Sequence, residues 1–182
     1  AAFSEDKNGE PVNLIEFGTY NYPGELGAQG LNAYIFALIT LDSESYAVPD
    51  GSRYTRTGII KEILAAEEPG GGFGLDKGAF DIDITAMALQ ALAPYYGSQN
   101  ALSVGISPGE ISRTVDRALA RLASVMKENC TFCSYGAENT ESTAQVIIAL
   151  CSLGIDPRTD ERFMRGGKNI VDGMQSFLLS RG

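Results

Sequence analysis

Histidine and tryptophan are both absent from the 182 residues of this chain. The lack of histidine excludes a Ser-His-Asp triad, a Cys-His pair and any zinc site with an imidazole ligand. The lack of tryptophan argues against a large aromatic cage. Together these absences remove several common arrangements for nucleophilic and zinc-dependent chemistry.

Basic residues are also scarce, with 14 Lys and Arg against 23 Asp and Glu, for a formal net charge of −9. Phosphate contacts need clustered basic side chains, so we expect no nucleic-acid partner and no anionic membrane surface. No apolar run is long enough to span a bilayer, and we expect no membrane insertion. Residues 1–7 lack the basic and apolar regions of a signal peptide, although a mature exported protein would look the same.

Cysteine occurs three times, as a Cys130-x-x-Cys133 pair and as Cys151 in an apolar run. One such pair without histidine supplies too few ligands for structural zinc, and its helical surroundings do not suit a redox motif. We expect Cys151 to be a buried free thiol and the other two to be loop thiols, either free or bridged. The sequence predicts no metal site and no cofactor.

One apolar segment occurs three times. Each copy begins with a polar residue, has a mostly apolar body and ends in Ala-Leu, at residues 29–38, 83–92 and 141–150. The closing alanines Ala37, Ala91 and Ala149 are 54 and 58 residues apart. A repeat of this length predicts units that bury their faces against their neighbours. Because the copies have almost no polar face, we expect three inner helices, each covered on both sides.

Amphipathic segments follow the inner helices and predict three outer helices, at about residues 58–67, 107–127 and 168–180. The second is the clearest, because its apolar residues are spaced by three or four. Ser107 is its expected N-cap, with Glu110 closing a capping box. In the third, Ile170, Met174, Phe177 and Leu178 are expected to point inward.

Alternating inner and outer helices predict an all-α fold, specifically a partial α/α toroid of about three helix pairs that forms one domain over residues 1–182. Three pairs are few for a closed toroid. We therefore expect either an arc of a larger toroid or a homo-oligomer that joins through its open ends.

The loops that enter the inner helices are rich in glycine, tyrosine and acidic residues, and they share one end of the fold. Residues 69–74 are mostly glycine but lack the Lys-Ser/Thr of a phosphate loop, so we interpret them as a flexible turn. Repeat proteins often place function on such a rim. The expected ligand-binding residues of this rim are Tyr20, Tyr22, Asp81, Asp83, Glu138, Asn139 and Glu141.

The acidic residues of the rim have alternative interpretations. Asp81 or Asp83 would cap the second inner helix, and Glu141 would favour the dipole of the third. Alternatively, a greasy cavity and a neighbouring carboxylate would keep Asp83 protonated as a general acid. The carboxylates would also suit a cation or a polyhydroxylated ligand, but no calcium-loop motif supports a dedicated site.

Gly-Gly-Phe-Gly at 71–74, followed by Asp-x-Asp-x-Thr-Ala-x-Ala-Leu-x-Ala-Leu at 81–92, resembles the repeat of the terpenoid-cyclase and protein-prenyltransferase superfamily. Segments 22–30, 36–43 and 141–157 are most similar to bacterial prenyltransferase-like, or squalene-cyclase-like, repeat proteins, which are related in architecture to the helical domain of transcobalamin. The resemblance implies an α/α toroid and an extracellular or cell-surface location.

The enzymatic branches of that superfamily match less well. Squalene-hopene-type cyclases use the middle acid of Asp-x-Asp-Asp, and here Ile84 follows Asp83. The zinc ligands of the prenyltransferases include a histidine, which this chain lacks. We therefore expect a non-catalytic module that binds a small molecule, glycan or protein. The alternatives are a degenerate cyclase with Asp83 as general acid, beside Asp81, and a purely structural repeat.

Overall fold

The computed structural model describes residues 3–134 and 136–179, and helix is its dominant element. The expectation of a helical fold is confirmed at that level, but it missed three antiparallel hairpins. These pair β1 (Phe3–Glu5) with β2 (Pro11–Asn13), β3 (Phe132–Ser134) with β4 (Ala137–Asn139), and β5 (Met164–Arg165) with β6 (Lys168–Asn169). Each strand has only two or three residues, too few for a recognisable alternation of polar and apolar residues.

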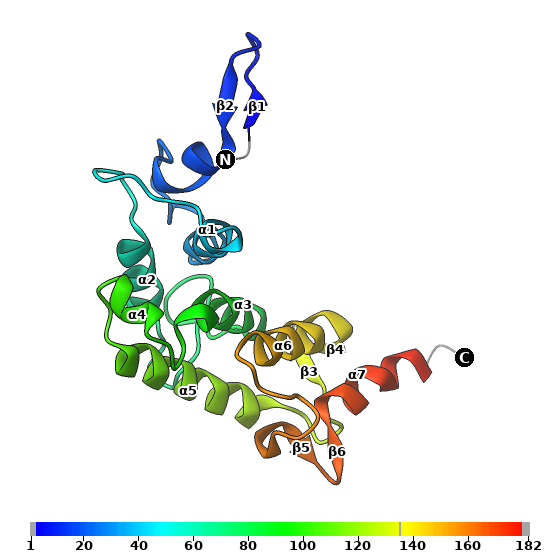
Figure 1. Cartoon of the computed structure of the whole chain (residues 1–182). Helices are drawn as coiled ribbons and strands as arrows, with labels where there is room; N and C mark the ends of the chain where they lie inside the picture. The colour runs from blue at the N-terminus through cyan, green and yellow to red at the C-terminus, as the bar shows by residue number, and fades with distance from the viewer. Residues whose placement is uncertain (1–2, 135, 180–182) are drawn as a thin grey trace.

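Four helices form a bent row, shown in Figure 1: α1 (Asn32–Ser43), α3 (Ile82–Leu92), α6 (Thr140–Ser152) and α7 (Ile170–Leu179). Within the row, α3 packs against both α1 and α6, and α6 packs against α7. The first three are the expected inner helices. Helix α1 begins three residues later than its repeat predicts, after Gly30, whose positive φ of 97° is not helical.

A second layer covers one side of the row. Helix α2 (Arg56–Ala65) packs against α1, and α5 (Pro108–Val125) packs against α3. The short helix α4 (Asn100–Ser103) lies on the same side in Figure 1. The core fills the space between the two layers. Its fully buried side chains include Leu38 and Leu41 of α1, Ile59, Ile60 and Ile63 of α2, Leu89 and Leu92 of α3, and Ile111 and Leu122 of α5.

Short elements complete the chain. A π-helical turn, η1 (Glu16–Tyr20), follows the β1–β2 hairpin, and this hairpin extends away from the helices at one end of the row in Figure 1. Two 3₁₀ turns, η2 (Ala93–Tyr95) and η3 (Glu161–Phe163), follow α3 and precede β5. The N-cap of α5 is Ser107, but its side chain makes no capping hydrogen bond, so the expected capping box is not formed.

Helix α7 corrects the expectation of a third outer helix, because it stands beside α6 as the fourth member of the row. The side chain of Asn169 accepts hydrogen bonds from the N–H groups of Val171 and Asp172, at 2.9 and 3.1 Å. Asp81 and Asn139 cap α3 and α6 in the same way, each accepting from the residue three positions later. The expected end of this helix at residue 180 lies outside the described residues.

Each cap residue also pairs with a residue of the strand or loop before it. Phe73 forms an isolated bridge with Asp81, and Phe132 pairs with Asn139. Both phenylalanines are fully buried. A hairpin-like turn and an N-cap therefore introduce α3 and α6, and the β5–β6 hairpin with Asn169 introduces α7 in the same manner.

The residue four positions after each cap fixes the helix to that turn. The Thr85 hydroxyl donates to Phe73 O at 3.0 Å and accepts from Phe73 N at 2.8 Å, and the Thr143 hydroxyl accepts from Phe132 N at 3.1 Å. The equivalent residue in α7 is Gly173, where a Cβ atom would collide with the carbonyl oxygen of Cys130. The first turn of α7 thus packs closely against the loop between α5 and β3.

The glycines of residues 69–74 allow this loop to pack closely against neighbouring residues. Gly71 and Gly72 have positive φ angles of 83° and 80°. A side chain on Gly72 would meet the Phe80 ring, and one on Gly74 would collide with the carbonyl of Ala79. The segment interpreted as a flexible turn is therefore a tightly packed loop beneath the start of α3.

The cysteine expectations also need correction. All three thiols are free, and Cys151 is exposed on α6 while Cys130 is buried. The Cys130 sulfur lies 3.4 Å from the carbonyl oxygen of Lys168, close enough for a weak S–H hydrogen bond. The apolar run around Cys151 suggested burial, but this residue is on a side of α6 that no described element covers.

The inner helices are not all covered on both sides. Helix α3 comes closest, with seven of its eleven residues buried. In contrast, Phe36 of α1 is 52% exposed, Ile148 of α6 is 48% exposed and Leu178 of α7 is 76% exposed. The prediction that Leu178 points inward is therefore wrong. The exposed apolar side chains lead to the candidate site.

Candidate functional site

We name the side of α1, α3, α6 and α7 that α2 and α5 do not cover the open face. Phe36, Gln90 and Ile148 each precede the closing alanine of the repeat, and Leu178 has the same offset from its cap as Ile148. Equivalent positions on neighbouring helices of a row face the same way. We call Phe36, Ile148 and Leu178 the apolar band. Exposed apolar side chains arranged in this way characterise interaction surfaces.

The open face has a second band two helical turns closer to the helix N-termini. Seven residues before each of the positions above lie Gln29, Asp83, Glu141 and Val171. Seven residues are nearly two full turns, so in α3, α6 and α7 the two positions are on the same side of the helix and about 10 Å apart. Gln29 lies before the start of α1 and is not part of this relation. We call Asp83 and Glu141 the carboxylate band.

A cavity of about 340 Å³ opens beside α1 at one end of the open face. It is lined by Asn32 and Phe36 of α1 together with Tyr22, Glu25 and Gln29 of the preceding loop. Tyr22 is 37% exposed, so one expected rim residue does reach an accessible surface. This cavity combines aromatic, amide and carboxylate groups.

Asp83 is half-buried between α3 and α6, near Ser142. Burial raises the pKa of the Asp83 carboxyl, the Ser142 hydroxyl lowers it, and the charges of Asp81 and Glu141 raise it further. Asp83 Oδ1 and Ser142 Oγ are both buried, and neither has a hydrogen bond of acceptable geometry among the described residues. The Ser142 side chain is fully buried. Such unsatisfied buried polar atoms are unusual in folded proteins.

Asp81 and Asn139 have structural partners. The Asp81 carboxylate accepts a hydrogen bond from Ile84 N at 2.9 Å, and the Asn139 side chain accepts one from Ser142 N at 2.8 Å. The capping interpretation therefore describes both residues. They hold the first turns of α3 and α6, and thereby position Asp83, Glu141 and Ser142.

Two further expected residues do not reach the open face. Tyr20 is buried, and its hydroxyl is 3.4 Å from Asn13 Nδ2. Glu138 is exposed, but its carboxylate accepts hydrogen bonds from Asn129 at 2.8 Å and Thr131 at 3.0 Å. These two hydrogen bonds lower the pKa of Glu138. We therefore leave Tyr20 and Glu138 out of the candidate site.

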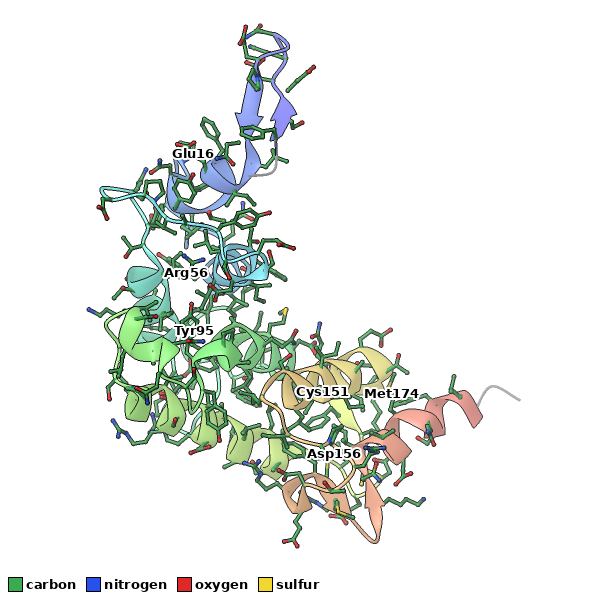
Figure 2. All side chains as sticks on the ribbon, in the orientation of Figure 1. Glu16, Arg56, Tyr95, Cys151, Asp156 and Met174 are labelled. Carbon is green, nitrogen blue, oxygen red and sulfur yellow. The ribbon has the colours of Figure 1, made fainter. Side chains whose placement is uncertain are left out.

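At the opposite end of the inner helices, one carboxylate has hydrogen-bond partners for both of its oxygens. Asp42, near the end of α1, accepts hydrogen bonds from Arg56 at 2.7 Å and from the Tyr95 hydroxyl at 2.8 Å. Arg56 also donates to the carbonyls of Leu41 and Tyr46, and Figure 2 shows Arg56 and Tyr95 close together there. Burial, then the hydrogen bond to Asp42, raises the pKa of Tyr95. We interpret this network as structural.

Sequence analysis missed Gln29, Phe36, Ser142, Ile148 and Leu178. The sequence held no signal for the apolar band, because Phe36 and Ile148 lie in mostly apolar segments and resemble core residues. Ser142 gave no signal either. Its position against Asp83 depends on how α3 packs on α6.

Metal and membrane sites have no support in the described ranges. No group of three or more Cys, Asp or Glu residues there is placed to hold a metal ion. Among the helices of residues 3–134 and 136–179, none is long and apolar enough to cross a bilayer.

Comparisons with protein-family models, curated proteins and solved structures gave no significant match. The functional argument therefore depends on the geometry of the open face.

Proposed function

We propose that the chain is a non-catalytic binding module, and that the open face is its binding surface. The observation that carries this proposal is the repeated exposure of Phe36, Ile148 and Leu178 at equivalent positions. Covering one such side chain contributes about 1.5–3 kcal/mol when it is fully buried, so a partner over the band gains appreciable energy. Because the band is an array across several helices, an extended partner suits it better than a small one.

We further propose that the bent two-layer arrangement is an arc of an α/α toroid of the prenyltransferase-like repeat class. The support is the order of the elements, in which α2 and α5 connect successive members of the inner row. The resemblance of residues 71–92 and 141–157 to that class adds to it. The same resemblance favours a secreted or cell-surface module.

A neutral solvatochromic dye such as Nile red tests the binding surface. The test protein carries Phe36→Ser and Ile148→Ser, and the matched control carries Leu102→Ser, because Leu102 is 58% exposed on α4 in the other layer. We expect dye fluorescence to fall by more than half in the double variant and to change little in the control. If both proteins are folded by circular dichroism and lose the same dye fluorescence, the open face is not the preferred apolar binding surface and the proposal is wrong.

A general-acid role for Asp83 is the second candidate, favoured by its raised pKa and its half-buried carboxyl. A cyclase-like reaction needs a closed, aromatic-lined cavity around the acid. The cavity that contains Tyr22 and Phe36 is not lined by Asp83. The experiment is incubation with a polyprenyl substrate, and turnover that Asp83→Asn abolishes would replace the binding proposal by this one.

A further inference from the structure

The cavity beside α1 is lined by polar side chains that the protein itself does not use. Tyr22, Glu25 and Gln29 are exposed there, and Thr40 is half-buried. None of these four side chains makes a hydrogen bond with another described residue. Asn32 also lines the cavity, but its side-chain oxygen is buried, so it offers at most its amide nitrogen. The polar groups of this cavity are therefore available to a ligand.

A second cavity, of about 490 Å³, lies near the C-terminal end of α1 and differs in this respect. Its lining includes Asp42, Arg56 and Tyr95, and the carboxylate of Asp42 accepts hydrogen bonds from both of the others. A ligand there has to replace hydrogen bonds that already exist, whereas a ligand beside Glu25 gains new ones. The cavity with free polar groups is the better binding site.

The loop between η1 and α1, which forms one wall of the cavity, is held in place by residues that precede α2. The Tyr54 hydroxyl accepts a hydrogen bond from Leu26 N at 3.0 Å and donates one to Gly24 O at 2.9 Å. Arg53 donates to Pro23 O at 2.6 Å. Leu26 is also buried in the core. A wall fixed in this way reduces the entropy lost when a ligand binds.

The types of polar group select the class of ligand. No lysine or arginine lines the cavity, so a phosphate or carboxylate ligand has no cationic partner there. The Glu25 carboxylate only accepts hydrogen bonds, whereas the Tyr22 and Thr40 hydroxyls and the Gln29 amide both donate and accept them. An ammonium ligand only donates and leaves the amide N–H group unpaired. Ligand hydroxyl groups donate and accept, so they match this mixed set.

Two aromatic rings supply the apolar part of the lining. Tyr22 is 37% exposed and Phe36 is 52% exposed, and both line the cavity. A pyranose ring has an apolar face of C–H groups and an edge of hydroxyl groups, so it complements the aromatic rings and the polar groups together. The volume of about 340 Å³ is near the lower end of ligand pockets, which range from about 300 to 1,000 Å³. A small ring therefore suits the cavity.

We infer that the cavity beside α1 binds a neutral sugar ring, with its C–H face against Tyr22 and Phe36 and its hydroxyl groups on Glu25 and Gln29. The inference goes beyond the proposed function, because it names a ligand class for one end of the open face. It needs only Phe36 of the apolar band.

Saturation-transfer difference NMR with glucose, galactose, mannose and N-acetylglucosamine tests this inference. We expect at least one of these sugars to bind with a Kd between about 0.1 and 10 mM, as suits a ligand of about 12–15 non-hydrogen atoms. The test protein carries Glu25→Ala and Gln29→Ala. The matched control carries Glu128→Ala and Gln99→Ala, which remove the same groups at exposed sites outside the cavity. We expect Kd to rise at least about tenfold in the test protein and less than about twofold in the control.

A second pair of variants tests the aromatic contact and separates this inference from the proposed function. Phe36→Ala removes a ring from the cavity, whereas Ile148→Ala shortens a side chain of the apolar band that does not line it. We expect the sugar Kd to rise at least about fivefold in Phe36→Ala and less than about twofold in Ile148→Ala. If this result holds but Nile red fluorescence is unchanged in Phe36→Ser/Ile148→Ser, the inference stands and the open face is wrong.

Three outcomes would overturn the inference. The first is that no sugar binds with a Kd below about 10 mM. The second is equal weakening of sugar binding in the Glu25→Ala/Gln29→Ala protein and its control, which would place the sugar elsewhere. The third is that tetramethylammonium binds more tightly than every sugar and loses this binding in Glu25→Ala/Gln29→Ala, which would make the cavity a cation site. The dye test of the open face is independent of all three.

Discussion

The carboxylates at the two ends of the inner helices differ in their hydrogen-bond partners. Asp42, near the C-terminal end of α1, is paired with Arg56 and hydrogen-bonded to Tyr95. Asp83, in the first turn of α3, has a buried oxygen without a hydrogen bond in the described part of the chain. A carboxylate with a full set of partners stabilises its surroundings, whereas a buried carboxylate oxygen without a hydrogen bond costs free energy. Under the proposed function, the C-terminal end of α1 has a structural role and the end of the row that carries Asp83 belongs to the proposed binding surface.

Loss of Arg56 should produce the largest effect. Arg56→Met removes the ion pair to Asp42, whose partners are mostly shielded from solvent at 19% and 18% side-chain exposure, and two hydrogen bonds to carbonyls. An unpaired carboxylate in such a place costs about 3–5 kcal/mol. We expect a Tm lower by roughly 6–15 °C, measured by thermal circular dichroism. The matched control is Arg158→Met, because the Arg158–Asp156 pair is exposed and contributes less than about 1 kcal/mol.

Thr85→Val should have the next largest effect, because the structural link between α3 and its loop passes through this hydroxyl. The substitution keeps the side-chain shape but leaves Phe73 N without its partner in the core. We expect a loss of about 2 kcal/mol in urea unfolding. Thr159→Val, at an exposed position, should change stability by less than about 0.5 kcal/mol. Equal stability of the two variants would show that the loop does not depend on this contact.

The apolar band should contribute little to folding. Phe36→Ala removes a side chain that is half-exposed, while Leu38→Ala removes one that is fully buried in the same helix. We expect urea unfolding to show a loss under about 1 kcal/mol for Phe36 and about 2–5 kcal/mol for Leu38. A large loss for Phe36→Ala would assign the apolar band to the core and weaken the binding proposal.

Asp83→Asn should give the smallest effect, and one of opposite sign. Because the pKa of Asp83 is raised in the folded protein above its ordinary 3.8, the ionised form destabilises the fold at neutral pH. We expect Tm at pH 7 to rise by roughly 1–3 °C. As pH falls through the raised pKa toward 3.8, wild-type Asp83 becomes protonated and this difference disappears. A Tm that falls at pH 7 would contradict the idea that Asp83 lacks partners.

The helical row was predictable where one physical rule dominates. The spacing of Ala37, Ala91 and Ala149 fixed three of its members, because thoroughly apolar helices must pack on each other. The position of α7 in the row was not predicted, because the polar residues of this helix resemble those of an amphipathic outer helix. Its cap at Asn169 and the tight turn before it were the better signals, but a two-residue strand has no detectable pattern.

The site was predictable only in part, because burial and pairing depend on tertiary packing. The sequence identified Asp83, Glu141 and Tyr22, which lie at the open face or its cavity. The sequence alone did not distinguish these residues from Asp81, whose carboxylate caps α3, or from Tyr20, whose side chain is buried in the core. The exposure of Phe36 and Ile148 was hidden for the same reason, since apolar residues read as core whether or not another element covers them.

Gly173 makes the start of α7 different from the starts of α3 and α6. In α3 and α6 a threonine at the equivalent place reaches its loop through a hydroxyl, but in α7 any side chain would collide with the Cys130 carbonyl. A unit copied from α3 or α6 could therefore not be shuffled into the place of α7 without remaking the contact. The three units are therefore not interchangeable at this end of the row, because the fit of α7 requires glycine at position 173.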